Sequence, residues 1–459
     1  MGRVAIMKIT PELLKERKCR EAFTICVVGC GRMGLPHACL FADAGFKVIG
    51  VDKNHRIIQN LEMGKSPFEE QGLQEKIERH VKEGRLTVTT DCGKAASESD
   101  IIFLSVNTPL DEEFNPDYSN ILNACEELGR ELKRDSLIIV ASTVGPGVTE
   151  TLIKDRLEET SGLKAGRDFG LAFSPIRATA GRVLYDVTYY MRVVGGIDAK
   201  SLEVACAVLK TIVKAGTVPV SSLRTAETIK LFQNVYRDVN LALTNEFALF
   251  CEKAGVDYLE VYKAANTDPY CHLLLPGLIS GHIPKDPYLL IKEAEKLNVE
   301  LRMATTARDV NEKVVEHTIH LVKETLKKCG KSLQGSKIAV LGISYKADVK
   351  ETKGSRALTI INLLKERGVK LKVYDPYFTS TELAKLNYPI VDRLEAAVKR
   401  TDCVVITVGH REFRSLNLKE LKSLMNEPPA ILDLSHIINP EEARREGMIY
   451  MGLGRGLYD

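Results

Sequence analysis

The sequence predicts an α/β protein in which two Rossmann-like domains, each with a doubly wound parallel sheet, are joined by a long central helical region. Three observations predict this class. Short β-branched runs alternate with helical patterns from residue 23, apolar residues then recur at helical spacing through the middle of the chain, and the first pattern returns at residue 337. Strands that alternate with helices form parallel sheets covered on both faces. These changes of pattern place the domains at 1–205, 206–328 and 329–459.

The expected elements follow in order along the chain. Strands of the first domain are expected at residues 23–29, 47–52, 100–106, 136–142 and 191–196. A helix of about thirty residues is expected over 225–255, where apolar residues recur at helical spacing. These residues are Ile229, Phe232, Val235, Val239, Leu243, Phe247 and Leu249. A second long helix is expected over roughly 301–328, after a Pro- and Gly-rich loop at 269–287. The last domain has expected strands at 337–345, 370–376, 402–409 and 430–436, and a helix over 355–367.

Composition restricts the class of function. The 459 residues are 44% hydrophobic and 27% charged with a net charge of +3, so neither nucleic acid nor a membrane is expected as the main partner. The first twenty residues are too charged for a signal peptide, and no apolar run is long enough to span a bilayer, which predicts a cytoplasmic protein. The eleven cysteines form no CxxC pair, so we expect reduced, mostly buried thiols and no metal site.

A glycine-rich turn follows the first expected strand. Residues 29–34 read Gly-Cys-Gly-Arg-Met-Gly, a GxGxxG that ends a strand and opens a helix, and Asp52 ends the next strand. In such a turn Gly29 permits the tight bend, Gly31 lets a pyrophosphate approach the backbone, and Gly34 allows close helix–strand packing. Asp52 would accept hydrogen bonds from the ribose hydroxyls and repel a 2′-phosphate. The sequence therefore predicts NAD as the cofactor.

The ordered motifs resemble the UDP-glucose/GDP-mannose dehydrogenase family over nearly the whole chain. Besides the turn, they include residues 106–109 (VNTP), 142–144 (STV), 174–177 (SPIR), 226–234 (AETIKLFQN), 245–246 (NE), 276–277 (PG), 284–287 (PKDP), 342–348 (GISYKAD) and 374–376 (YDP). The resemblance implies an NAD-binding domain over 1–205, a helical dimerisation domain over 206–328 and a UDP-sugar-binding domain over 329–459. It also implies a homodimer or higher homo-oligomer that acts in polysaccharide biosynthesis. The sequence of residues 236–246 and 281–287 is similar to that of the branch of the family that uses UDP-N-acetylhexosamines, such as UDP-N-acetyl-D-mannosamine.

The turn and the resemblance together suggest a set of site residues. The expected NAD-binding residues are Gly29, Gly31, Arg32, Met33, Gly34, Asp52, Thr108, Ser142 and Thr143. The expected UDP-sugar-binding residues are Arg177, Lys230, Asn234, Gly281, Tyr345, Lys346, Lys353 and Arg356. The expected catalytic residues are Lys230, Asn234, Asp286, His282 and Thr143.

Three of these assignments have plainer alternatives. Lys230 and Asn234 are one helical turn apart, so they share a face, and Lys230 is expected to stabilise an alkoxide or act as a base. The alternative for Lys230 is a surface ion pair with Glu227. The alternative for His282 is a structural role in its loop, and the alternative for Thr143 is a helix cap.

The chain departs from the family at two positions that the resemblance makes essential. Family members form a thioester on a cysteine in a segment close to G-G-H-C-I-P-x-D-P, but here His282 runs straight into Ile283. The family glutamate of S-P-E-R is replaced by Ile176, which cannot carry a proton. Lys353 stands where the family has an arginine, a loss for which Arg356 could compensate. Cys271 is the nearest other thiol, and we interpret it as an ordinary loop cysteine.

Three functional hypotheses follow from these departures. The first is an enzyme that uses NAD and a UDP-sugar for a two-electron oxidation, or for epimerisation through a transient ketone. The second is a conventional UDP-sugar 6-dehydrogenase that makes a uronate with a relocated nucleophile. The third is a non-catalytic nucleotide-sugar-binding protein. The first hypothesis is favoured, because a nucleophile and a glutamate that act in the same step are both missing.

Overall fold

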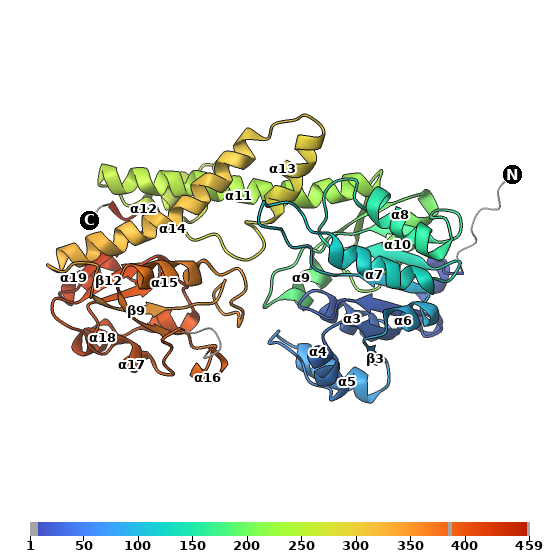
Figure 1. Ribbon diagram of the computed structural model, residues 1–459, viewed down its shortest axis with the longest axis horizontal. Helices are drawn as coiled ribbons and strands as arrows, with labels where there is room; N and C mark the ends of the chain where they lie inside the picture. Colours follow the sequence, from blue (N-terminus) through green and yellow to red (C-terminus); the bar gives the residue numbers. More distant parts are fainter. Residues whose placement is uncertain (1–7, 384–387, 457–459) are drawn as a thin grey trace. The chain divides into compact units, whose positions relative to one another are not determined.

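The computed structural model describes residues 8–383 and 388–456 and divides into two compact units (Figure 1). The first unit contains the chain through Gln233 together with Tyr288–Val299. The second contains Asn234–Pro287 and the chain from Glu300 onward. Each unit carries its own sheet flanked by helices, mostly parallel in the first unit and wholly parallel in the second, so the expected fold class of two Rossmann-like domains with long central helices is confirmed.

The first unit is built on an eight-stranded sheet with the order β3-β2-β1-β4-β5-β6-β7-β8. The strands are β1 (Thr24–Val28), β2 (Lys47–Val51), β3 (Leu86–Thr89), β4 (Ile101–Leu104), β5 (Leu137–Val140), β6 (Gly170–Phe173), β7 (Arg192–Gly196) and β8 (Thr217–Pro219). Its first six strands have the doubly wound order in which dinucleotides bind where the chain reverses direction across the sheet. One expectation was wrong, because β7 runs antiparallel to β6 instead of parallel. The segment 174–191 therefore returns to the sheet at the edge where β6 ends.

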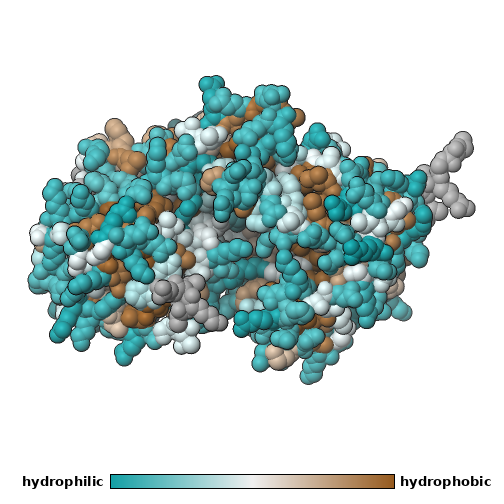
Figure 2. All heavy atoms as spheres, in the orientation of Figure 1, coloured by the Kyte–Doolittle hydropathy of each residue, from teal (hydrophilic) through white to brown (hydrophobic). Residues whose placement is uncertain are grey.

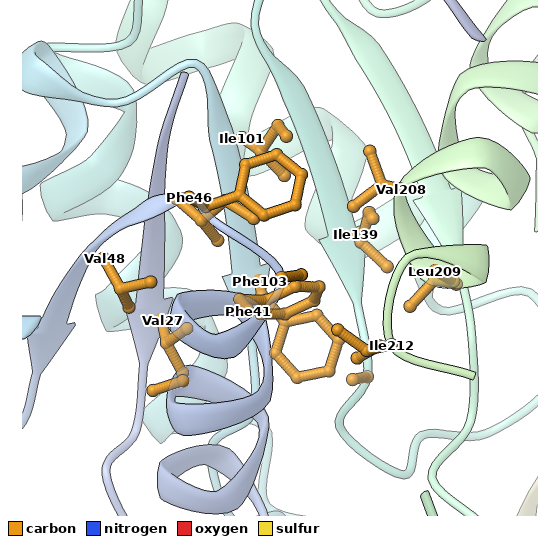
Figure 3. Packing of buried hydrophobic residues seen from close by; sticks show 14 of the residues in the cluster. Val27, Phe41, Phe46, Val48, Ile101, Phe103, Ile139, Val208, Leu209 and Ile212 are labelled. Atoms are coloured by element: carbon orange, nitrogen blue, oxygen red, sulfur yellow. The ribbon is translucent and has the colours of Figure 1, made fainter. Parts of the chain in front are cut away.

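Helices cover both faces of this sheet. They are α3 (Gly34–Asp43), α4 (His55–Glu62), α5 (Leu73–Lys82), α6 (Cys92–Glu98), α7 (Ser119–Arg130), α8 (Lys154–Ser161), α9 (Val183–Tyr189) and α10 (Ala199–Lys210), preceded by the short α1 (Pro11–Lys15) and α2 (Arg17–Arg20). Figure 3 shows Phe41 of α3 and Leu209 of α10 packed against the sheet around Phe103. Burial of these side chains fixes the face on which the helices sit.

The second unit contains a five-stranded, wholly parallel sheet with the order β10-β9-β11-β12-β13. The strands are β9 (Lys337–Leu341), β10 (Lys370–Tyr374), β11 (Cys403–Ile406), β12 (Ala430–Asp433) and β13 (Ile449–Gly452). Its helices are α12 (Tyr258–Ala265), α14 (Arg302–Lys328), α15 (Arg356–Glu366), α16 (Ser380–Leu383), α17 (Leu394–Val398), α18 (Leu418–Leu424) and α19 (Pro440–Arg445). The order changes direction between β9 and β11, and ligands bind at such a switch point in open α/β sheets.

The long central helix α11 (Leu223–Ala254) and the shorter α13 (Asp286–Lys296) join the two units. Within the second unit α11 lies beside α14, and Ala248 packs into the same core as Val314 and Val322. The opposite side of α11 exposes Tyr236, Leu243, Phe247 and Phe250, at 65%, 42%, 42% and 69% respectively. These spacings of seven, four and three residues place the four side chains along one face of the helix.

Hydrophilic residues cover most of the molecular face drawn in Figure 2. Among the described residues, every helix is too short or too polar to cross a bilayer. All of the cysteines are free thiols, and only Cys19 and Cys271 are not buried. This agrees with the expected pattern of buried, reduced cysteines.

Candidate active site

The glycine turn connects β1 to α3, as the sequence predicts. Gly29 has a φ of +95°, and a Cβ there would overlap the carbonyl oxygen of Ser105. A Cβ on Gly34 would overlap the carbonyl oxygen of Gly29, whereas a Cβ on Gly31 would meet no atom within 4 Å. The first and third glycines are therefore required by the protein's own backbone. The second leaves open space beside the N-terminus of α3, where a pyrophosphate would bind.

Asp52 follows β2 beside this turn. Its Oδ2 accepts a hydrogen bond from Cys30 N at 3.0 Å, and its Oδ1 accepts one from Asn54 N at 2.9 Å. Each carboxylate oxygen retains lone-pair capacity for a ribose hydroxyl, and the side chain is half-buried. Arg32 lies over the Phe68 ring, with its guanidinium carbon 5.1 Å from the ring centroid. These contacts fix the turn without using all of the hydrogen-bonding capacity of Asp52.

Replacing Asp52 by alanine is expected to weaken NADH binding by about tenfold to hundredfold and to relax the rejection of NADPH. The variant loses the ribose acceptor and the negative charge together. Asp52→Asn is the control, because it keeps an acceptor for Asn54 N but removes the charge, so it should admit NADPH with a smaller loss of NADH affinity. Fluorescence titration with both nucleotides measures the effect. Unchanged NADH affinity with continued rejection of NADPH would contradict the assignment.

The loop after β5 lies at the same edge of the sheet. Ser142 Oγ accepts a hydrogen bond from Val106 N at 2.9 Å, which joins the ends of β4 and β5, and Thr108 is buried beside them. Thr143 is half-buried, and it does not cap the following helix, because that helix starts at Thr149 with Val148 as its N-cap. The helix-cap alternative for Thr143 is therefore wrong.

Glu227 of α11 forms hydrogen bonds with the backbone of the loop after β5. The fully buried carboxylate accepts hydrogen bonds from Gly147 N and Thr149 N, and its burial raises the pKa of Glu227 to about 7. Lys230 is buried as well and donates from Nζ to the carbonyl oxygen of Ile176 at 2.9 Å. The alternative of a surface ion pair between Lys230 and Glu227 is therefore wrong, because both side chains are buried.

The turn after β6 gathers cationic side chains. Arg192, at the start of the reversed β7, is 2% exposed and donates to Ser174 Oγ at 2.9 Å and to the Ser174 carbonyl at 3.1 Å. Its third contact is His37 Nε2 at 2.9 Å. Arg177 donates to the carbonyl of Met191 at 3.3 Å, and its Nε is buried without a hydrogen-bond partner.

In the second unit the loop before α13 brings Asn234 and Asp286 together. Asp286 begins α13, is 1% exposed, accepts a hydrogen bond from Asn234 Nδ2 and lies 3.2 Å from Lys285 Nζ. The amide nitrogens of Lys285 and Asp286 both donate to the carbonyl of His282, whose side chain is exposed. Two of the expected catalytic residues, Asn234 and Asp286, are therefore in contact, and His282 contributes its backbone carbonyl to the turn.

The Ser280–Gly281 segment lies against the first turn of the second Rossmann-like domain. Gly281 has a φ of +79° and donates from N to the Gly354 carbonyl, and a Cβ there would lie 2.9 Å from the Tyr345 ring. Ser280 Oγ accepts from Arg356 N at 3.1 Å. The Arg356 guanidinium pairs with Glu312, while Lys346 and Lys353 are exposed.

A cavity of about 250 Å³ opens at the switch point of this second sheet. Its walls come from 275–280, 344–347, 355–357, 407–414 and 434–437, which include the residues that follow β9, β11 and β12. Asp375 ends β10 as Asp52 ends β2, but its Oδ2 is occupied by Ile343 N, Ser344 N and His410 Nε2. The Asp375 carboxylate therefore serves mainly to hold the turn after β9, whereas Asp52 keeps hydrogen-bonding capacity for a ligand.

A buried network that we did not predict holds the loop beside the cavity. Arg308 of α14 donates from Nε and Nη2 to the two carboxylate oxygens of Asp238 of α11, and from Nη1 to the Pro284 carbonyl at 3.3 Å. Asn311 Nδ2 donates to Asp238, and Asn311 Oδ1 accepts from Asn245 Nδ2. The side-chain amide of Asn245 also donates to the Gly277 carbonyl and accepts from Gly277 N. A sequence signal was available, because Arg308 shares the helical phase of the apolar positions of α14.

Comparison with known proteins gives consistent matches along the chain. Residues 23–213 match the NAD binding domain of the UDP-glucose/GDP-mannose dehydrogenase family, residues 224–313 its central domain and residues 339–440 its UDP binding domain. UDP-N-acetyl-D-mannosamine dehydrogenase of Pyrococcus horikoshii is 33% identical over 434 residues, which cover 94% of this chain and 99% of that protein.

Solved structures agree with this assignment. The structure of the UDP-D-ManNAc dehydrogenase from Pyrococcus horikoshii has a TM-score of 0.87 at 32% identity and covers 95% of this chain and 100% of its own. A Methanosarcina mazei protein described as an NDP-N-acetyl-D-galactosaminuronic acid dehydrogenase has a TM-score of 0.80 at 33% identity, with 100% and 99% coverage. This chain therefore belongs to the UDP-glucose/GDP-mannose dehydrogenase family and is an NAD-dependent oxidoreductase.

Proposed function

We propose that this protein oxidises a UDP-sugar of the UDP-N-acetylhexosamine class by two electrons per turnover, without the cysteine-thioester route to a uronic acid. The same site would epimerise the sugar if the hydride returned to the ketone. The observation that carries the proposal is Ile176, whose side chain is buried in the apolar core while its carbonyl holds Lys230. An apolar side chain in this position cannot activate the water that hydrolyses a thioester.

The cavity of the second unit supports binding of the UDP moiety. Its wall includes Ser355 and Ala357, at the N-terminus of α15, where backbone N–H groups and the helix dipole favour a phosphate. Arg414 supplies a cationic side chain to the same wall, and Tyr345 supplies an aromatic ring. The similarity to UDP-N-acetyl-D-mannosamine dehydrogenases favours an N-acetylated sugar.

Residues of this chain would handle the proton of the oxidised hydroxyl. NAD, when bound at the glycine turn, supplies the hydride acceptor. The buried ammonium of Lys230 would stabilise the alkoxide that forms as the hydroxyl proton leaves. In the second unit Asp286 would act as a proton acceptor, and Asn234 would orient its carboxylate.

Product analysis with NAD and a panel of UDP-hexoses, UDP-N-acetylhexosamines and their UDP-uronates tests this proposal. For at least one of them we expect a sugar that has lost two hydrogens with one NADH formed, or an epimer with no net NADH, and no UDP-uronate made from a neutral sugar. A uronate formed with two NADH per sugar and abolished by Cys271→Ser would overturn the proposal in favour of a relocated nucleophile. Binding of NAD and UDP-sugar without any product would overturn it in favour of a binding protein.

The exposed apolar face of α11, made by Tyr236, Leu243, Phe247 and Phe250, supports a homodimer as the working form. Four large apolar side chains on one face are costly to leave in water, and a second copy of the same helix would cover them. Phe247→Glu is expected to convert a dimer into a monomer at micromolar concentration, as measured by light scattering. The matched control is Met303→Glu, which places the same charge at a 75% exposed position of α14. A wild-type monomer would contradict the proposal.

A further inference from the structure

Two guanidinium groups, those of Arg177 and Arg192, lie beside the turn after β6. Arg192 is bound by Ser174 and by the uncharged ring of His37, and Arg177 is bound by the carbonyl of Met191. Among residues 8–383 and 388–456, the hydrogen-bond partners of both groups are uncharged, and no acidic side chain contributes to the pKa of either group. Burial and the charge of Arg177 lower the pKa of Arg192 to about 9, which leaves it protonated at neutral pH.

The turn itself explains why the positive charge is uncompensated. The position between Pro175 and Arg177 carries Ile176, whose side chain packs into the apolar core. Arg192 is 2% exposed and can act only through its field, whereas Arg177 is half-buried. Buried cations persist in folded proteins when an anion or hydrogen bonds stabilise them.

We propose that Arg177 binds a carboxylate of the substrate, so that the UDP-sugar enters already oxidised to a uronic acid at C6. This inference rests on the proposed function and specifies its substrate class. A bidentate guanidinium–carboxylate pair in the field of Arg192 supplies the missing counter-charge. It also gives one reason for both departures from the family, because a substrate that is already an acid needs neither a thioester-forming cysteine nor a glutamate for hydrolysis.

The reaction then takes place at a ring carbon that bears a secondary hydroxyl. The C–H bond breaks and its hydride reduces NAD⁺ to NADH, while the O–H bond breaks and its proton leaves through a base of the site. A C=O double bond forms, so the products are a keto-uronate nucleotide, NADH and one proton. The carboxylate is unchanged and serves for recognition only.

The test is isothermal titration of the full-length protein in the presence of NADH. The ligands are UDP-N-acetylglucosamine, UDP-N-acetylglucosaminuronate, UDP-glucose, UDP-glucuronate and UDP. We expect each uronate to bind about tenfold to hundredfold more tightly than its neutral counterpart. Arg177→Met should abolish this preference while affinity for UDP stays the same, and Arg177→Lys should keep part of it.

Arg130→Met is the matched control, because Arg130 is an exposed arginine of the same unit whose partner Glu126 keeps a second ion pair with Arg156. It should leave the preference intact. Equal binding of neutral and acidic sugars by the wild type would overturn the inference, as would an Arg177→Met variant that loses NADH affinity as much as uronate affinity. If NADH forms as readily with neutral UDP-N-acetylhexosamines as with uronates, the proposed function stands and this inference fails. If no sugar is oxidised but the uronate preference is present, the proposed function fails and the carboxylate site stands.

Discussion

Replacing Arg308 by alanine is expected to lower the free energy of unfolding of the second unit by about 3–5 kcal/mol, because the variant leaves a buried carboxylate without its partner. Arg308 and Asp238 are 1% and 0% exposed. The same guanidinium holds the Pro284 carbonyl, so the loop that leads to Asp286 should become mobile as well. Chemical denaturation measures the first effect. Hydrogen exchange at Gly277, whose amide is held by Asn245, measures the second.

Two further variants separate the buried pair from its exposed neighbour. Glu312→Ala removes a 42% exposed contact of Arg308 and should cost less than about 1 kcal/mol. The double variant Asp238→Asn with Arg308→Met removes both charges and should recover much of the stability lost in Arg308→Ala, because no unpaired charge remains. A cost below about 1 kcal/mol for Arg308→Ala, or equal costs for the single and double variants, would contradict this account.

The glycines of the NAD-binding turn should divide into two classes. Gly34→Ala is expected to destabilise the first unit by about 1–3 kcal/mol or more and to abolish NADH binding, because its Cβ would overlap the Gly29 carbonyl. Gly31→Ala is expected to leave the melting temperature unchanged but to weaken NADH binding by about tenfold or more, because the free protein has room for this methyl group and a bound pyrophosphate would not.

Thermal denaturation with and without NADH distinguishes the two variants. Gly34→Ala should melt early under both conditions, whereas Gly31→Ala should melt like the wild type alone and gain less from NADH. Gly216→Ala is a useful reference, since the Cβ of residue 216 also has open space but the φ of +89° strains an alanine there, so Gly31→Ala should melt no earlier than this variant. If Gly31→Ala bound NADH normally, the open space beside Gly31 would not be the pyrophosphate site.

Several features could be predicted because they depend on local physical chemistry. The strands β1, β2, β4 and β5 follow from short β-branched runs, and the helices α11 and α14 follow from apolar spacing. The NAD turn could be predicted because the steric need for glycine and the placement of an acid depend on neighbouring residues in one βαβ unit. The short strands β3 and β8 carry too few residues for a clear pattern and were not predicted.

Other features required the tertiary structure, because they depend on residues far apart in the chain. The sequence by itself determined the fold class, the family and NAD as cofactor, and it predicts that Ile176 stands where the family has a glutamate. Only the folded chain showed that β7 reverses direction, which places Arg192 beside Ser174, eighteen residues earlier. It likewise showed that Lys230 is buried and contacts Ile176, fifty-four residues away. Burial and charge pairing are properties of the space around a side chain, and that space is filled by residues that the linear sequence does not place together.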